Sequence, residues 1–250
     1  GILDIFDRYN FTVREDEPLE KEVAVDPEML GKVFENLLEV KDRKSKGTYY
    51  TPREIVHYMC QQSLINYLST ELSASAIASP EGAKQSLPTK KDIEMLVKHG
   101  EQVSENEVAV EAKGKETRDY KYKLPESIRQ NAELIDEKLI NIKVCDPAIG
   151  SGAFPVGMMS EIVKTRNVLS VYIKVKDRTI YTFKRECIEK SLYGVDIDVS
   201  AVEIAKLRLW LSLVVDEDDF QQIKPLPNLD YKIVCGNSLL GVEKDLFNSR

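Results

Sequence analysis

The sequence predicts an α/β fold with a parallel, doubly wound sheet, preceded by a helical N-terminal region. Three observations support this class. From residue 142 onward, three short apolar runs that suit buried strands alternate with runs that suit helices. Each of the three strand-like runs ends in polar side chains, and a glycine-rich turn follows the first of them. Before residue 70, apolar residues recur at helical spacing instead.

Composition narrows the class of protein. The 250 residues, 42% hydrophobic and 31% charged, suit a soluble chain with a core, and no apolar run is long enough to span a membrane. The net charge of −7 argues against a surface built mainly to hold DNA phosphates. The cysteines lack C-x-x-C spacing, so no zinc site is expected; Cys60, Cys145 and Cys235 are predicted core residues in a reducing, cytoplasmic compartment. Gly1 without an initiator Met indicates a fragment excised from a longer protein.

The first element is a short amphipathic piece at residues 2–14, followed by a helix that starts at Asp26 and Pro27. The apolar stripe of this helix comprises Met29, Leu30, Val33, Phe34, Leu37 and Leu38. Glu39-Val40-Lys41 matches the E-x-K pattern of metal-dependent nucleases. That pattern needs converging strands, whereas these residues continue a helix, so we expect them to be solvated.

A capping box begins the next helix, with Thr51 as N-cap, Pro52 at the first helical position and Glu54 at the third. The predicted apolar face of this helix comprises Val56, Met59, Cys60, Leu64 and Tyr67. Gly47-Thr48-Tyr49-Tyr50 comes directly before the box. Two interpretations remain open: the segment is only a well-capped helix start, or its tyrosines line a ligand pocket.

Residues 70–140 are predicted to form a mostly helical insertion, packed less tightly than its flanks, between segments 1–69 and 141–250. One or two helical turns are expected from Lys90 to Leu96, and a helix from Leu124 to Leu139. His99 and the E-x-K at residues 111–113 are expected to be solvated.

The last segment contains the predicted sheet: strands end near Asp146, Asp196 and Asn237, with helices at about 152–165 and 199–215. The second of these helices is apolar nearly all round and should be covered on more than one side. Ser200 and Glu203 form a second capping box. Residues 171–183 alternate in polarity, which indicates a small hairpin or a helix bend, and residues 184–190 should be helical.

The three polar strand ends should lie together, because ligands of such sheets bind beyond the carboxyl ends of the strands. Gly150 and Gly152 are expected to place unpaired backbone N–H groups at a helix N-terminus, as a seat for a phosphate or carboxylate. Asp196 is either a helix cap or an acceptor for both hydroxyls of a ribose. Asp198 is the better cap, so we expect Asp196 to be free.

Three interpretations of this turn are open: it binds a dinucleotide, it binds S-adenosylmethionine (SAM), or it is only a turn and binds no ligand. A dinucleotide fingerprint, G-x-G-x-x-G, needs a third glycine where the chain has Pro155, and Asp196 comes far later than about 20 residues after the turn. No P-loop sequence is present. A cofactor with a ribose and an amino-acid carboxylate, such as SAM, therefore fits better than one with a pyrophosphate.

Four motifs carry a resemblance to N6-adenine DNA methyltransferases. Residues 146–154, Asp-Pro-Ala-Ile-Gly-Ser-Gly-Ala-Phe, resemble the SAM-binding motif, and residues 47–52 resemble the amino-terminal cofactor motif of the gamma-order members. Residues 194–198 resemble the ribose-binding strand end, and residues 235–239 resemble the adenine-contacting motif. The order is similar to type II enzymes that fuse restriction and modification, and to type I modification subunits.

The resemblance implies the first strands of a Rossmann-like, SAM-dependent methyltransferase core. Tyr50, Thr51 and Pro52 would border the methionine end of SAM. Asp146, Ala148 and Gly150 would hold its amino and carboxylate groups, Asp196 its ribose, Ile197 the adenine ring and Asn237 the adenine amino group. As members of the same motifs, the remaining cofactor-binding residues are Pro147, Gly152, Phe154 and Ser238.

This sequence departs from the family pattern in one respect, the absence of the catalytic motif. The family's catalytic motif, Asn/Asp-Pro-Pro-Tyr/Phe, orients the flipped adenine, and this sequence contains no Pro-Pro pair. We expect that motif beyond Arg250, so these residues bind SAM without a catalytic residue or metal of their own. The resemblance implies a bacterial or archaeal cytoplasmic enzyme. It also implies two partners: DNA, contacted mostly through parts of the protein outside these residues, and a restriction or specificity module. The alternative is a non-catalytic interaction module that docks a partner subunit or self-associates through an exposed sheet edge.

Overall fold

The computed structural model describes residues 51–78, 87–113, 124–175, 178–214, 225 and 227–240, with no side-chain description for 75–78 and 106–113. The predictions for residues 2–14, the helix from Asp26, Glu39-Val40-Lys41 and Tyr50 lie outside these residues, as do the side chains of the E-x-K at 111–113.

The chain forms two compact units, and each of them is discontinuous in sequence. We call residues 52–143 with 157–191 the helical unit, and residues 144–156 with the chain from 192 onward the sheet unit; Thr51 also belongs to the sheet unit. One boundary falls within a helix, after Val156. Because both units combine distant segments, they do not follow the predicted segments 1–69, 70–140 and 141–250, which stay a prediction.

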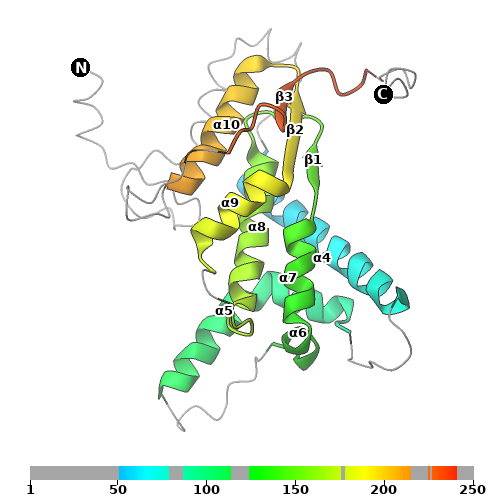
Figure 1. Ribbon diagram of the computed structural model, residues 1–250, viewed down its shortest axis with the longest axis vertical. Helices are drawn as coiled ribbons and strands as arrows, with labels where there is room; N and C mark the ends of the chain where they lie inside the picture. Colours follow the sequence, from blue (N-terminus) through cyan, green and yellow to red (C-terminus); the bar gives the residue numbers. More distant parts are fainter. Residues whose placement is uncertain are drawn as a thin grey trace, which may run out of the picture. The chain divides into compact units, whose positions relative to one another are not determined.

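Within the described residues, the sheet unit contains three parallel strands in the order β1-β2-β3, side by side in Figure 1. These are β1 (Val144–Asp146), β2 (Leu192–Asp196) and β3 (Ile233–Cys235). Parallel neighbours need crossover connections, and helices follow β1 and β2: α8 (Ala153–Leu169) and α10 (Val199–Val214). The predicted α/β class with a parallel sheet is confirmed, with Asp146 paired to Gly194 and Asp196 paired to Cys235 in the register.

Helix α10 packs against β2 and β3 and buries one face. Ala205 and Leu209 on this face are fully buried, as are Leu192 and Ile233 in the strands. The opposite face stays partly open, because Leu207 and Trp210 are 38% and 40% exposed. The prediction that α10 is covered on more than one side is therefore wrong for the described residues.

The start of α10 corrects a second prediction. Asp198 is the cap, because its Oδ1 accepts the Ser200 N–H at 2.8 Å. Ser200 already lies inside the helix, so the predicted capping box is displaced. Glu203 instead forms an ion pair with Lys206 at 3.1 Å.

The cysteines divide differently from the prediction. Cys60 is buried, as expected, but Cys145 and Cys235 are exposed. They lie on β1 and β3, the two outer strands of the described sheet, and an outer strand has a neighbouring strand on one side only. An apolar run in the sequence identifies the strand but does not show how well each of its side chains is covered.

The helical unit comprises five complete helices within the described ranges and most of α8. Helix α4 packs against α5 and α7, α5 against α6, and α7 against α9. The five helices are α4 (Arg53–Ala78), α5 (Lys90–Lys113), α6 (Glu126–Gln130), α7 (Ala132–Asn141) and α9 (Ile180–Lys190). None of the helices in the described part of the chain is long and apolar enough to cross a membrane.

The expected loose packing between residues 70 and 140 is not observed in the described parts of that segment. Ile93, Leu96, Ile128, Ile135 and Leu139 are all completely or almost completely buried. Each of these helices keeps one apolar stripe, and α6 packs against both α5 and α7. The exposed His99 agrees with its predicted solvation.

The start of α4 is also shifted. The Pro52 carbonyl accepts the N–H groups of Ile55 and Val56, so the helix begins at Arg53, one residue later than the capping box predicts. Val56, Cys60 and Leu64 are buried as predicted, whereas Met59 is about half exposed.

Of the two alternatives for residues 171–183, the hairpin is not found in the described residues, which contain no strand, and α9 starts at Ile180. The Thr179 hydroxyl accepts the Thr182 N–H at 3.1 Å and thereby caps this helix. The short polar–apolar alternation suggested a strand, but the N-cap at Thr179 is the better guide to the structure of these residues. The helix predicted at 184–190 is confirmed as the later part of α9.

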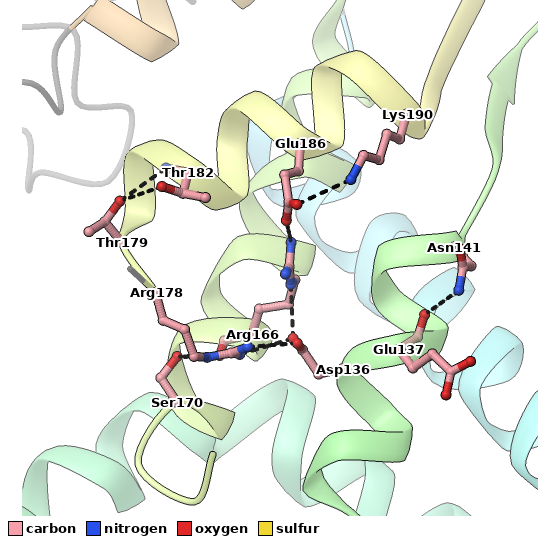
Figure 2. Close-up of polar contacts among 10 residues, drawn as sticks. All are labelled: Asp136, Glu137, Asn141, Arg166, Ser170, Arg178, Thr179, Thr182, Glu186 and Lys190. Carbon is pink, nitrogen blue, oxygen red and sulfur yellow. Dashed lines mark hydrogen bonds and ion pairs between the residues drawn. The ribbon is translucent and has the colours of Figure 1, made fainter. Parts of the chain in front are cut away.

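A buried ionic network joins α7, α8 and α9 (Figure 2). The Asp136 carboxylate accepts hydrogen bonds from Arg166 Nε at 2.9 Å and from Arg178 Nη1 at 2.7 Å. Arg166 also donates to Glu186, and both guanidinium groups lie over the Phe183 ring, at 4.3 and 4.9 Å from its centroid. Burial alone would raise the pKa of Asp136, but the hydrogen bonds and charges of Arg178 and Arg166 outweigh it and hold that pKa below its ordinary value.

We expect Asp136→Asn to lower the free energy of unfolding by about 3–5 kcal/mol near neutral pH, because two buried guanidinium groups lose their counter-charge. The stabilisation by Asp136 is complete above its ordinary, unfolded-state pKa and is lost as the pH falls through its lower folded-state pKa. Urea unfolding of both proteins across this range should therefore show the difference shrinking in acid. Glu137→Gln, the exposed neighbour on the same helix, is the control and should change little; equal effects of the two substitutions would contradict the assignment.

Candidate cofactor site

The turn between β1 and α8 needs its two glycines for different reasons. Both adopt the left-handed conformation, with φ of +52° at Gly150 and +89° at Gly152. A Cβ on Gly152 would lie 3.1 Å from both Cα and Cβ of Ala205, so the turn approaches the backbone of α10 closely. A Cβ on Gly150 would meet no atom within 4 Å. Gly150 is thus required by conformation alone, and Gly152 by conformation and space.

The backbone donors of this turn are already used inside the sheet unit. The Ala148 N–H donates to Asp146 Oδ1 at 3.0 Å, the Ile149 N–H to the Val195 carbonyl at 2.9 Å and the Gly152 N–H to the Ile149 carbonyl at 2.9 Å. The Gly150 N–H donates to Asp196 Oδ2 at 2.8 Å. The expectation that Gly150 and Gly152 present unpaired N–H groups is therefore wrong, because the end of β2 and the turn itself supply acceptors.

Asp196 holds the turn in place. Besides Gly150, it binds the N–H of Asp198, which donates to its Oδ1 at 2.9 Å. The expectation that Asp196 is free is thus corrected, although Asp198 does cap α10. An ionised carboxylate offers about four acceptor positions, so the two backbone bonds leave capacity for a ligand's hydroxyl groups.

Asp146 contains an unsatisfied acceptor atom of the site. Its Oδ1 accepts the Ala148 N–H, but its Oδ2 is buried and accepts no hydrogen bond from any residue that the structure describes. Burial raises the pKa of Asp146 and the nearby Asp196 charge raises it further, against the Ala148 hydrogen bond. A buried carboxylate oxygen without a donor is costly when ionised. It is therefore suited to a ligand that brings its own donor, best of all a cationic one.

The end of β3 joins the same structure. The Ser238 hydroxyl donates to the Pro147 carbonyl at 2.7 Å, which ties the segment after β3 to the turn after β1. Asn237 Oδ1 accepts the Leu239 N–H at 3.0 Å, while the Asn237 side chain remains exposed. Ile197, which follows Asp196, is 61% exposed and offers an apolar surface. The three predicted strand ends thus belong to one hydrogen-bonded edge of the sheet unit.

The amino-terminal cofactor motif is only partly described. Tyr50 lies outside the described residues, and Thr51 and Pro52 lie just before α4, in different units. Phe154 is half-buried in the first turn of α8. The role of these four residues in ligand binding stays a prediction.

Arg208 was not predicted from the sequence. It lies in α10 with 3% of its surface exposed, and its Nη1 donates to the Ser151 carbonyl at 3.1 Å. The available signal was a single cation within the apolar run Leu207-Arg208-Leu209-Trp210-Leu211, where every neighbour is apolar. Charged residues are rarely fully buried unless they bind something.

We expect Gly152→Ala to destabilise the protein more than Gly150→Ala. The Gly150 variant adopts a left-handed backbone in open space, at a cost of about 1–2 kcal/mol. The Gly152 variant adds the contact with Ala205 and should cost about 3–5 kcal/mol. Chemical unfolding of both variants checks this order; an equal loss would show that the turn does not pack tightly on α10.

Comparison with known proteins gave two matches. Residues 122–243 match a family model described as "MmeI, DNA-methyltransferase domain". Over 247 residues the chain is 32% identical to a Methanocaldococcus jannaschii protein whose name describes a type II restriction enzyme and methyltransferase. This alignment covers 96% of the chain and 18% of the relative, so the chain spans less than a fifth of that protein. No solved structure matched.

Both matches confirm the resemblance predicted from the four motifs, namely to a restriction–modification methyltransferase. The family match includes the glycine turn, the end of β2 and the segment after β3. The part of the chain with the unsatisfied carboxylate is therefore also the part that is similar to a methyltransferase domain.

Proposed function

We propose, from this similarity to the methyltransferase domain of a restriction–modification enzyme, that the sheet unit binds S-adenosylmethionine at the carboxyl ends of its strands. The observation that carries the proposal is the buried Asp146 Oδ2, which has no hydrogen-bond partner among the residues that the structure describes. The amino-acid end of SAM has an ammonium group, the kind of donor that this atom needs. An interaction module would give no reason to bury such an acceptor without a partner.

The other predicted residues suit the rest of the cofactor. Asp196 keeps acceptor capacity for the two ribose hydroxyls while it holds the turn. The exposed Ile197 offers an apolar surface to the adenine ring, and the Asn237 amide offers polar groups to its edge. In this proposal the acids lie at the ammonium group and the ribose of SAM, and the apolar side chain lies at its adenine ring.

When bound, SAM supplies an electrophilic methyl group on a sulfonium centre. The residues described above bind and orient the cofactor, and none of them is assigned a proton transfer. In the whole protein the methyl acceptor is the N6 amino group of adenine in DNA. Because residues 1–250 contain no Pro-Pro pair, we assign base orientation, DNA recognition and any restriction or specificity module to other parts of that protein.

Asp146→Asn should weaken SAM binding by about 10- to 100-fold, the expected loss of one charge-assisted hydrogen bond. The ammonium prefers the ionised carboxylate, so binding should release a proton, and affinity should fall as the pH is lowered through the raised pKa of Asp146. In Asp146→Asn this pH dependence should be absent. Titration calorimetry over a pH series measures both effects.

The matched control is Asp198→Asn, because Asn caps a helix as well as Asp does. This variant removes one nearby charge and should retain the affinity and pH profile of the wild type. If Asp146→Asn binds SAM as tightly as the wild type, Asp146 does not hold the ammonium group, and the proposal loses its main support.

The whole protein should produce N6-methyladenine in DNA incubated with SAM, detected by mass spectrometry of the nucleosides. Production of N4- or C5-methylcytosine instead would reject the adenine assignment but retain the cofactor. Residues 1–250 alone should give no methylated base.

A further inference from the structure

We infer that Arg208 is a positioning residue for the glycine turn: from α10 it holds the Ser151 carbonyl and thereby keeps the turn in one conformation before a cofactor binds. The inference concerns the turn itself, and its consequence for SAM affinity rests on the proposed function. Arg208 belongs to none of the four motifs.

The burial of this guanidinium needs an explanation. The guanidinium group is a cation with five N–H donors, and only 3% of the surface of Arg208 is exposed. Ala205 and Leu209 fill the same buried face of α10 with apolar atoms. Burying a charge for stability alone is a poor solution, because well-packed apolar residues often stabilise equally well. One contact of this guanidinium is with the Ser151 carbonyl, to which Arg208 Nη1 donates at 3.1 Å.

The peptide between Ser151 and Gly152 is held at both ends. A peptide group is planar, so its C=O and N–H point in opposite directions. Arg208 binds the C=O, and the Ile149 carbonyl accepts the N–H. The orientation of the whole peptide plane is thereby determined. Without Arg208, one side of this restraint is lost.

Glycine makes the restraint necessary. Gly150 and Gly152 allow the positive φ values of the turn, but glycine also permits many other conformations. The turn follows directly from Asp146, whose Oδ2 is the proposed ammonium acceptor. A turn that is ordered in advance loses less conformational freedom on binding, which increases affinity. Since Arg208 contacts the turn through a backbone carbonyl and no reacting atom, its loss should raise KM for SAM and leave kcat nearly unchanged.

Three variants of the whole protein test the inference. Arg208→Met keeps the length of the side chain but removes every donor, and Arg208→Lys keeps the charge and a donor. Lys206→Met is the control, because Lys206 lies on the same helix but pairs with Glu203 and Asp230 instead of the turn.

The first measurement needs no cofactor. Amide hydrogen exchange in residues 148–152 should be about 10- to 100-fold faster in Arg208→Met, partly restored in Arg208→Lys and unchanged in Lys206→Met. If exchange in the turn is unchanged, or rises only in step with the rest of the sheet unit, Arg208 is merely structural and the inference is overturned. If Arg208→Met does not fold, the same comparison is made between Arg208→Lys and the wild type.

The second measurement is the steady-state methylation of DNA. Arg208→Met should raise KM for SAM about tenfold, with kcat within about twofold of the wild type, and Arg208→Lys should lie between them. An unchanged KM overturns the inference about affinity. If the wild type does not bind SAM but the turn still loosens in Arg208→Met, the proposed function fails while the role of Arg208 in the turn stands.

Discussion

The hydrogen bond from the Gly150 N–H to the Asp196 carboxylate is the contact on which the candidate site depends. It connects the turn after β1 to the end of β2, two segments far apart in the sequence. Around it, the Val195 carbonyl holds Ile149, Arg208 holds Ser151, and Ser238 holds Pro147. A turn with two positive-φ glycines would otherwise be free to adopt several shapes. The strand ends therefore form one framework, in which Asp146 Oδ2 accepts no hydrogen bond from the described residues.

The two acidic side chains at the strand ends, Asp146 and Asp196, differ in how many of their carboxylate oxygens accept hydrogen bonds. Asp196 accepts two backbone N–H groups, whereas Asp146 keeps one buried oxygen without a donor in the described chain. The charge of Asp196 also raises the pKa of Asp146. Such a pair favours the arrival of a cation, which would relieve both the missing hydrogen bond and the repulsion between the acids. Local rules of polar satisfaction are broken mainly where a protein binds something.

The helical unit shows the opposite arrangement. Asp136, Arg166, Arg178 and Glu186 form a network in which each described charge has a partner, around the aromatic ring of Phe183. Opposite charges lie close there, so the pKa of Asp136 is lowered while that of Asp146 is raised. The two acids thus differ in environment: Asp136 is buried and paired with two arginines, whereas Asp146 is only partly buried and keeps one buried oxygen that accepts no hydrogen bond from the described residues.

The sequence by itself determined the α/β class, the three strand ends, the Asp198 cap and the resemblance to a restriction–modification methyltransferase, because these depend on local patterns and short motifs. Only the tertiary structure decided that the N–H groups of Gly150 and Gly152 are engaged and that Asp196 holds the turn, since their partners lie on other segments. It also decided that Cys145 and Cys235 are exposed and that Arg208 supports the turn. Burial and hydrogen-bond partners are set by which segments meet in space, and a single sequence without those contacts shows only which residues are able to form them.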